Sequence, residues 1–206
     1  MNHWIILPIL LPAIVAPVLV LAARYDLGLA RALSLGTAVL ALGLALGLLL
    51  SASDSSVAQV YALGDWPAPF GIVLVLDRLS ALMLMLAALL SLVVLLYAVG
   101  DSDGRGRHFH ALWQFQVMGI NGAFLTGDFF NLFVFFEVLL IASYGLLLSG
   151  GRGLRLRIGL HYVVFNVSAS TVFLIALGLL YAVLGTLNMA EIGQRLLGEA
   201  GGHADA

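Results

Sequence analysis

Glu137 is the residue whose type and position most clearly indicate chemistry in this 206-residue chain. It lies inside a long apolar segment, and no other charged residue occurs between Asp128 and Arg152. If a helix enters a membrane at Phe129, eight residues place the Glu137 carboxyl ~12 Å deep. A carboxyl at that depth must be protonated, paired with a cation or beside water. We therefore predict that Glu137 exchanges protons; the alternative is a permanently protonated carboxyl that only bonds to a neighbouring helix.

Three further polar residues near apolar segments are candidates for a proton relay. Asp77 and Arg78 are adjacent at the outer boundary of the third apolar segment, and Tyr144 follows Glu137 in the fifth. Adjacent positions of a helix point about 100° apart, so Asp77 and Arg78 are not expected to pair with each other. One of them could face the interior as a charge partner. The alternative is that Arg78 snorkels to the membrane interface.

The sixth apolar segment carries a polar stripe that extends the candidate relay. Tyr162, Asn166 and Ser170 recur every four residues, and His161 is seven residues before Ser168. Residues with these spacings share a face of a helix. His161 is expected about one turn below the cytoplasmic boundary, where an imidazole could pass protons. The alternative for the stripe is hydrogen bonding between helices, which contributes ~0.6–2 kcal/mol per contact.

The elements that must position these residues are membrane-spanning helices. Hydrophobic residues make up 62% of the chain and charged residues 10%, against about 25% charged residues in soluble domains. This composition excludes a soluble enzyme and a disordered chain, and a net charge of −2 without a basic tract excludes a nucleic-acid binder. The chain has no Cys, which excludes disulfides and thiolate metal sites.

Six apolar segments are long enough to cross a hydrocarbon core of about 30 Å. They are expected at Ile5–Ala23, Ala32–Leu50, Ile72–Val99, Ala111–Gly127, Phe129–Leu148 and Ile158–Leu184. Seven of the nine Arg residues follow the first, third and fifth segments. The positive-inside rule then places these three connections in the cytoplasm and both termini outside. The sequence thus predicts an all-α polytopic membrane protein with about six transmembrane helices.

The outer connections carry their own patterns. Residues 51–71 combine alternating apolar residues with a Pro/Gly turn, which predicts a small hairpin on the outer surface. Asn188–Leu197 is expected to form an interfacial amphipathic helix, followed by a disordered tail. The expected organisation is three spans and the hairpin in residues 1–110, three further spans in residues 111–190, and an interfacial or disordered tail in residues 191–206.

Three stretches of the sequence resemble a known family. They are Gly64–Met83, with the motif Trp-Pro-Ala-Pro-Phe-Gly, Met118–Tyr144, with Phe-Phe-Glu137, and Gly159–Asn166. Each resembles the N-terminal part of the D subunit of Mrp-type multisubunit monovalent cation/proton antiporters. These D subunits are similar to the antiporter-like membrane subunits of respiratory complex I. The resemblance runs from Pro8 to about Met189.

The resemblance implies a partial antiporter-like fold. Family members have two inverted five-helix repeats that begin at the fourth span, so residues 111–190 are expected to form the start of the first repeat. The resemblance also implies that Glu137 matches an essential glutamate, which in the family pairs with a lysine on a broken seventh helix. This chain has no Lys, and its sixth span is its last. It is therefore expected to be an N-terminal fragment, or a split or truncated product. Arg78 is then the only candidate cationic partner for Glu137 within the predicted spans.

The leading hypothesis is a proton-translocating subunit, or part of one, of a monovalent cation/proton antiporter. Its expected partners are other membrane subunits, H⁺, Na⁺ or another monovalent cation, and the lipid bilayer of a bacterial inner membrane. No metal, organic cofactor or nucleic acid is expected.

Two alternatives remain open from the sequence. The first is a proton-pumping membrane-arm subunit of a NADH–quinone oxidoreductase or hydrogenase-type complex. The chain is expected to be an ion-transporter subunit rather than an enzyme by itself, and under this alternative it would be classed with the membrane subunits of NADH:quinone oxidoreductases. The second is a non-transporting assembly subunit in which Glu137 is structural.

Overall fold

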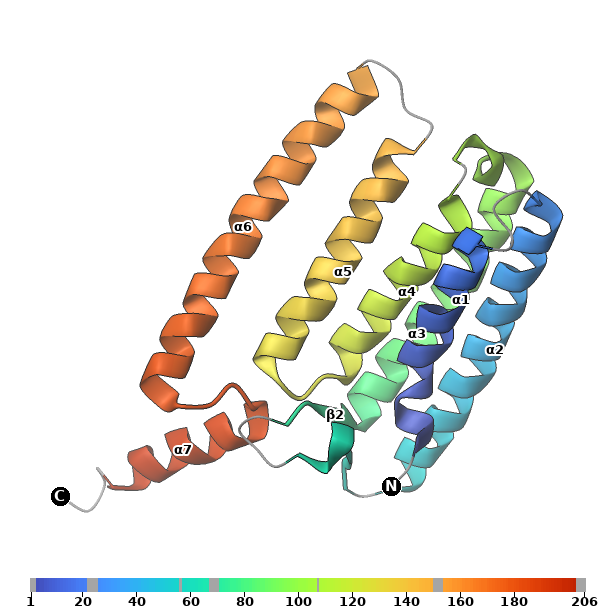
Figure 1. Cartoon of the computed structure of the whole chain (residues 1–206). Helices are drawn as coiled ribbons and strands as arrows, with labels where there is room; N and C mark the ends of the chain where they lie inside the picture. Colours follow the sequence, from blue (N-terminus) through green and yellow to red (C-terminus); the bar gives the residue numbers. More distant parts are fainter. Residues whose placement is uncertain are drawn as a thin grey trace.

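The computed structural model describes residues 3–21, 26–55, 57–66, 71–106, 108–149 and 154–202, and it is a helical bundle with a small hairpin at one end (Figure 1). The helices are α1 (Leu7–Leu21), α2 (Leu27–Asp54), α3 (Arg78–Asp101), α4 (Phe109–Leu125), α5 (Phe129–Leu148), α6 (Leu154–Leu184) and α7 (Met189–Gly202). The strands are β1 (Gln59–Ala62) and β2 (Val73–Leu76), and short 3-10 turns are η1 (His3–Ile5), η2 (Leu63–Asp65) and η3 (Asp103–Arg105).

Helices α1 to α6 occupy the six positions predicted for spans. Among the described residues, α2, α3, α5 and α6 are long and apolar enough to cross a membrane. Helices α1 and α4 have 15 and 17 residues, which gives lengths of about 23 and 26 Å at 1.5 Å per residue. The polytopic α-helical architecture is therefore confirmed, and crossing by the two shorter helices stays a prediction.

The third span starts later than the sequence predicted. Residues 73–76 form strand β2 rather than the first turns of a helix, and α3 begins only at Arg78. The alternating Val-Leu-Val-Leu sequence suits a strand, because its two leucines are buried and its two valines are half-buried. Strand β2 pairs antiparallel with β1, so that Gln59 lies opposite Leu76. The outer hairpin is thus present, but its second strand lies inside the segment assigned to the third span.

Backbone hydrogen bonds join the hairpin, the link between α4 and α5, and the segment between α6 and α7. The short link between α4 and α5 lies beside β2, where the Gly127 amide donates to the Val73 carbonyl at 2.8 Å. On its other side the same link pairs with the segment before α7, through Phe129 N–H to Leu187 O at 2.9 Å and Met189 N–H to Gly127 O at 2.9 Å. A Cβ at Gly127 would lie 2.7 Å from a Val75 methyl group. The Val75 side chain therefore leaves no room for a Cβ at this position.

The helix ends are arranged as the charge pattern predicts. Figure 1 shows the ends of α1, α3 and α5, with the starts of α2, α4 and α6, at one end of the bundle. The N and C marks, β2 and α7 lie at the opposite end. The described arginines Arg31 and Arg157 belong to the first of these ends, whereas Arg24, Arg107 and Arg152 lie outside the described residues. The assignment of this end to the cytoplasm stays a prediction.

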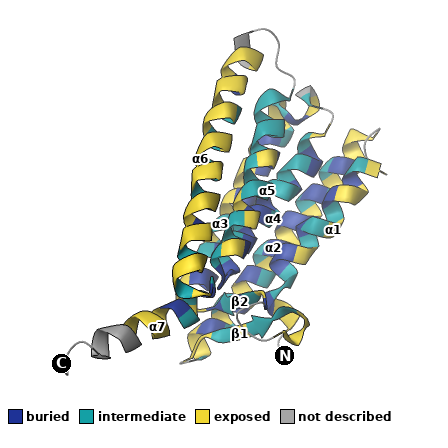
Figure 2. Ribbon diagram, turned by 60° about the vertical axis from the view of Figure 1, so that its left-hand side comes forward, coloured by how far each residue is buried: buried dark blue, intermediate teal, exposed yellow. Residues whose placement is uncertain are grey.

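Helix α4 is central in the bundle because it packs against both α1 and α5. Gly119 and Gly122 on α4 allow α5 to approach closely: a Cβ at Gly119 would lie 2.9 Å from the Phe135 carbonyl oxygen. Helix α6 packs against α5 and is exposed along most of its length (Figure 2). Helix α7 continues to Gly202, five residues beyond the helix predicted to end at Leu197.

Candidate functional site

Glu137 lies on the face of α5 that packs against α6. Asp128 caps the start of α5, because its carboxylate accepts a hydrogen bond from the Asn131 amide at 2.9 Å. The helix therefore begins at Phe129, the residue from which the depth of Glu137 was counted. The Glu137 side chain is half-buried. Its Oε1 accepts a hydrogen bond from the Ser170 hydroxyl of α6. The carboxyl thus lies between two apolar helices with one side-chain donor from the second helix.

Two residues of the polar stripe of α6, Tyr162 and Ser170, contact α5 at this same interface. The rings of Tyr144 on α5 and Tyr162 on α6 are in edge-to-face contact, with centroids 5.7 Å apart. One turn along α6, the Asn166 amide donates to the Tyr162 carbonyl at 2.8 Å. We call Glu137, Tyr144, Tyr162, Asn166 and Ser170 the polar seam. It contains two of the predicted relay residues: Tyr144, which contacts α6 through Tyr162, and Asn166, whose hydrogen bond stays within α6.

The other predicted relay residues lie elsewhere. Asp77 caps α3: its carboxylate accepts from the Ser80 amide at 2.6 Å, and the Ser80 hydroxyl accepts from the Asp77 amide at 2.9 Å. The hydrogen bond from the Ser80 amide lowers the pKa of Asp77. Arg78 donates to the Ser53 carbonyl at 3.5 Å, at the end of α2. Among the described residues, no ion pair joins Arg78 to Glu137.

His161 is exposed on α6 and lines a groove with Ser168, so these two residues share a face, as their spacing predicts. Its Nδ1 contacts the Arg157 carbonyl oxygen at 2.8 Å. The groove is formed by residues of α6 itself and is separate from the Glu137–Ser170 contact. The structure therefore places His161 outside the polar seam.

A buried amide on α4 has a structural role that the sequence alone did not indicate. Pro12 in α1 has no N–H, so the Pro8 carbonyl four residues earlier lacks its helical donor. The Asn121 side-chain amide donates to this carbonyl at 2.8 Å. The signal was present in the sequence as a Pro in one span and a lone Asn in another, but only the packing of α1 against α4 shows that they are partners.

The fold and the polar seam together define a class: a multi-pass α-helical membrane protein with a titratable carboxyl held between two spans. Residues 126–203 match the family model described as "NADH:quinone oxidoreductase/Mrp antiporter, TM". The chain is 51% identical over 200 residues to a probable K⁺/H⁺ antiporter D subunit from Rhizobium meliloti. It is 43% identical over 200 residues to a Na⁺/H⁺ antiporter D subunit from Bacillus subtilis. Each match covers 95% of this chain.

Solved structures agree with the sequence comparisons. A chain of the Mrp complex from Dietzia sp. superposes with a TM-score of 0.86 at 34% identity, over 93% of this chain and 36% of that one. A chain of the archaeal membrane-bound sulfane sulfur reductase superposes with a TM-score of 0.87 at 26% identity, over 92% of this chain and 39% of that one. The chain is thus a relative of the D subunits of Mrp-type antiporters, which confirms the resemblance of its motifs. It spans 37% and 40% of the lengths of the two curated relatives.

Proposed function

We propose that this chain forms the part of a monovalent cation/proton antiporter subunit that carries the proton-exchanging group, Glu137. The observation that carries the proposal is the contact of Glu137 with Ser170 between α5 and α6. The relatives named as D subunits of K⁺/H⁺ and Na⁺/H⁺ antiporters support the same class of transport. Na⁺ and K⁺ are accordingly the two cations to compare.

Two features around Glu137 act in opposite directions on its protonation. The Ser170 hydroxyl stabilises the ionised carboxylate by donating a hydrogen bond to it. The apolar residues of α5 stabilise the neutral acid, because a charge is costly away from water. A proton can therefore bind and leave when a small change in the surroundings shifts this balance. The polar seam toward Tyr144 and Asn166 supplies further hydrogen-bonding groups along the path.

In the part of the chain that the structure describes, no cation forms an ion pair with Glu137. Arg78, the candidate within this chain, contacts the Ser53 carbonyl at the end of α2 and not Glu137. The chain contains no Lys. We therefore propose that the protein works beside other membrane subunits, in a bacterial inner membrane. We also propose that a cation from outside these 206 residues, on another subunit or on further residues of the same polypeptide, faces the α5–α6 interface.

The test is cation/proton exchange in everted membrane vesicles that contain the complete complex. Glu137→Gln keeps the size of the side chain but cannot release a proton. We expect Na⁺- or K⁺-driven proton movement to fall by more than about tenfold, which corresponds to about 1.4 kcal/mol, because the amide introduced at this position has no acidic proton to exchange. Ser170→Ala removes only the donor and should give a smaller loss. Asp54→Asn changes an exposed carboxylate at the end of α2 and serves as the matched control. Exchange that survives in Glu137→Gln would support the non-transporting assembly role instead.

The redox-coupled alternative has its own support in the structural comparisons. Besides the sulfane sulfur reductase, a chain of respiratory complex I from Thermus thermophilus superposes with a TM-score of 0.74 at 26% identity, over 91% of this chain and 38% of that one. In that case the same proton site would be driven by electron transfer in partner subunits. Mass spectrometry of the intact complex separates the two functions: small hydrophobic partners support the antiporter, and flavin- or iron–sulfur-bearing partners support the redox complex.

A further inference from the structure

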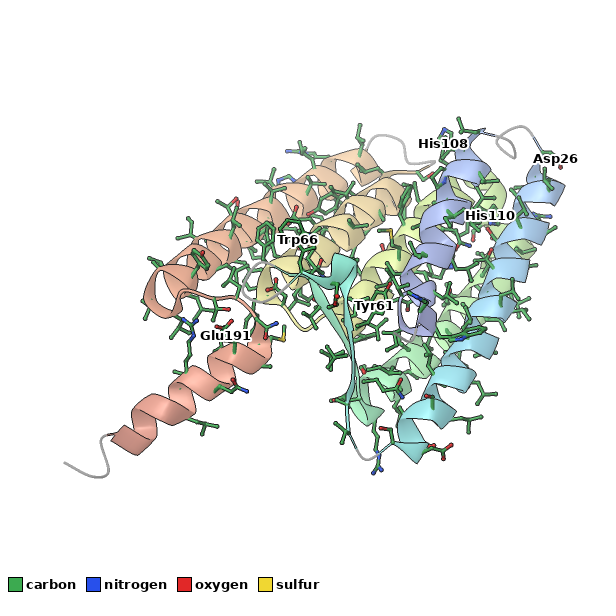
Figure 3. The ribbon with its side chains drawn as sticks, turned by 60° about the horizontal axis from the view of Figure 1, so that its bottom comes forward. Asp26, Tyr61, Trp66, His108, His110 and Glu191 are labelled. Atoms are coloured by element: carbon green, nitrogen blue, oxygen red, sulfur yellow. The ribbon has the colours of Figure 1, made fainter. Side chains whose placement is uncertain are left out.

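A second cluster of charged and titratable side chains lies at the end of the bundle opposite β2. Arg31 of α2 donates two hydrogen bonds to Asp103 of η3, from Nε at 2.6 Å and from Nη2 at 2.7 Å. His110 of α4 contacts the same carboxylate through Nε2 at 3.2 Å. Asp103 is 1% exposed and His110 is 5% exposed. Figure 3 shows His110 at the end of the bundle that also carries Asp26 and His108.

The tautomer of His110 follows from its partner. The two hydrogen bonds from Arg31 lower the pKa of Asp103, so this carboxylate is ionised and only accepts hydrogen bonds. The Nε2 atom of His110 must then carry a hydrogen and donate it to Asp103. The other ring nitrogen, Nδ1, is then a basic atom, and it is buried without a hydrogen-bond partner among the residues that the structure describes. A buried nitrogen of this kind is a place where a proton can bind.

The charge of the cluster depends on that nitrogen. With His110 neutral, Arg31 and Asp103 balance each other and the cluster carries no net charge. A proton on Nδ1 gives the cluster one net positive charge and places it on a ring that is only 5% exposed, whereas the Arg31 side chain is 37% exposed. Such a charge is costly unless water or another partner reaches it.

Helices α1 and α5 bring no carboxylate to His110. Helix α1 has no titratable residue over Leu7–Leu21. The carboxyl of α5, Glu137, faces α6. The titratable residues at the nearby ends of α2, α3 and α4 have exposed side chains; they are Asp26, Tyr97, Asp101 and His108. Of these, Asp101 has an interaction partner.

We propose that His110 is a second proton-binding residue of this chain, and that its protonation opens the Arg31–Asp103–His110 cluster and loosens η3 from α2 and α4. The cluster holds these three elements together when His110 is neutral. When the pH falls, the open form takes up the proton more readily than the closed form, because its imidazole is exposed to water. Acid therefore shifts the equilibrium toward the open form.

The test is hydrogen–deuterium exchange of the intact complex over residues 101–112, corrected for the intrinsic pH dependence of exchange. In the wild type we expect corrected exchange to rise by up to about tenfold for each pH unit below ~6.5, the ordinary pKa of histidine. His110→Gln keeps an N–H donor for Asp103 but cannot bind a proton, so its exchange should stay low at all pH values. His108→Gln, the exposed neighbour, should behave as the wild type. Asp103→Asn should exchange rapidly even at about pH 8, above the titration range of histidine.

Two results would overturn the proposal. The first is wild-type exchange over this segment that does not change between about pH 8 and about pH 5.5, which needs no variant to fold. The second is a His110→Gln profile that matches the wild type. The readout is independent of transport: Glu137→Gln should keep the pH response of residues 101–112, so failure of the proposed function and failure of this inference are distinguishable.

Discussion

Replacing Gly119 by Ala tests the packing that fixes α5, the helix that carries Glu137. A Cβ at this position would lie 2.9 Å from both the Phe135 carbonyl oxygen and the Leu139 amide nitrogen, and 2.8 Å from the Leu139 Cβ. Two of these atoms belong to the backbone of α5, which cannot rotate away as a side chain can. The added methyl group must therefore push α5 from α4, on the side of α5 that faces away from α6.

The size of the effect follows from two opposing contributions. Overpacking in a tight interface costs about 1–3 kcal/mol. Ala stabilises a helix by up to about 1 kcal/mol relative to Gly, which offsets part of this cost. We expect Gly119→Ala to reduce stability by about 0.5–2 kcal/mol. Gly43→Ala on α2 is the matched control, because a Cβ there meets nothing within 4 Å; it should be neutral or slightly stabilising.

The assay is thermal unfolding of the purified complex in detergent, followed by cation/proton exchange of the same variants in vesicles. Gly119→Ala should lower the unfolding temperature relative to Gly43→Ala and should also reduce exchange, because the Glu137–Ser170 contact depends on the position of α5. Equal stability of the two variants would refute the reasoning, since it would mean that the backbones of α4 and α5 are not in contact at Gly119.

Two further predictions concern buried and surface hydrogen bonds. Asn121→Leu leaves the Pro8 carbonyl without a donor and should destabilise the bundle by about 1–3 kcal/mol. Unfolding of this variant is compared with unfolding of Asn121→Gln, which keeps an amide. Unchanged stability of Asn121→Leu would contradict the role of Asn121 as the substitute donor. At α7, Glu191 accepts from the Thr186 hydroxyl at 2.7 Å and from Arg195 at 2.5 Å, and these contacts lower its pKa, the Thr186 bond most. Their contribution is therefore complete above the ordinary pKa of about 4.3 and is lost as the pH falls through the lowered pKa. Protease cleavage within α7 should increase over that acid range in the wild type but not in Glu191→Gln, which should be cleaved readily already at neutral pH.

The candidate site was predictable where local pattern and membrane physics suffice. The apolar surroundings of Glu137 and the four-residue spacing of Tyr162, Asn166 and Ser170 both depend on positions along a single helix. Helix periodicity alone therefore placed the stripe on one face. The structure adds that Tyr162 and Ser170 of this face contact α5, and that Ser170 is the residue that contacts Glu137.

The pairing of Arg78 with Glu137 was suggested by elimination, and the structure does not bring the two together. Arg78 is at the first residue of α3, at the end of the bundle where Asp77 caps the helix. The late start of α3 explains this position, because strand β2 takes the residues that were assigned to the first turns of the third span. Apolar residues with period two inside a longer apolar run are not separable from a helix by composition.

The order of residues along the chain is enough to predict a polytopic α-helical membrane protein, with its Arg-rich connections at one end and Glu137 deep in an apolar helix. These properties depend on the cost of placing charges and free backbone groups in lipid, which applies residue by residue along each span. The residues that meet across spans became known only from the packed bundle: Ser170 with Glu137, Asn121 with Pro8, and Arg31 with Asp103 and His110. Those contacts depend on how helices far apart in the sequence are rotated and packed, and periodicity within one helix carries no information about its neighbour.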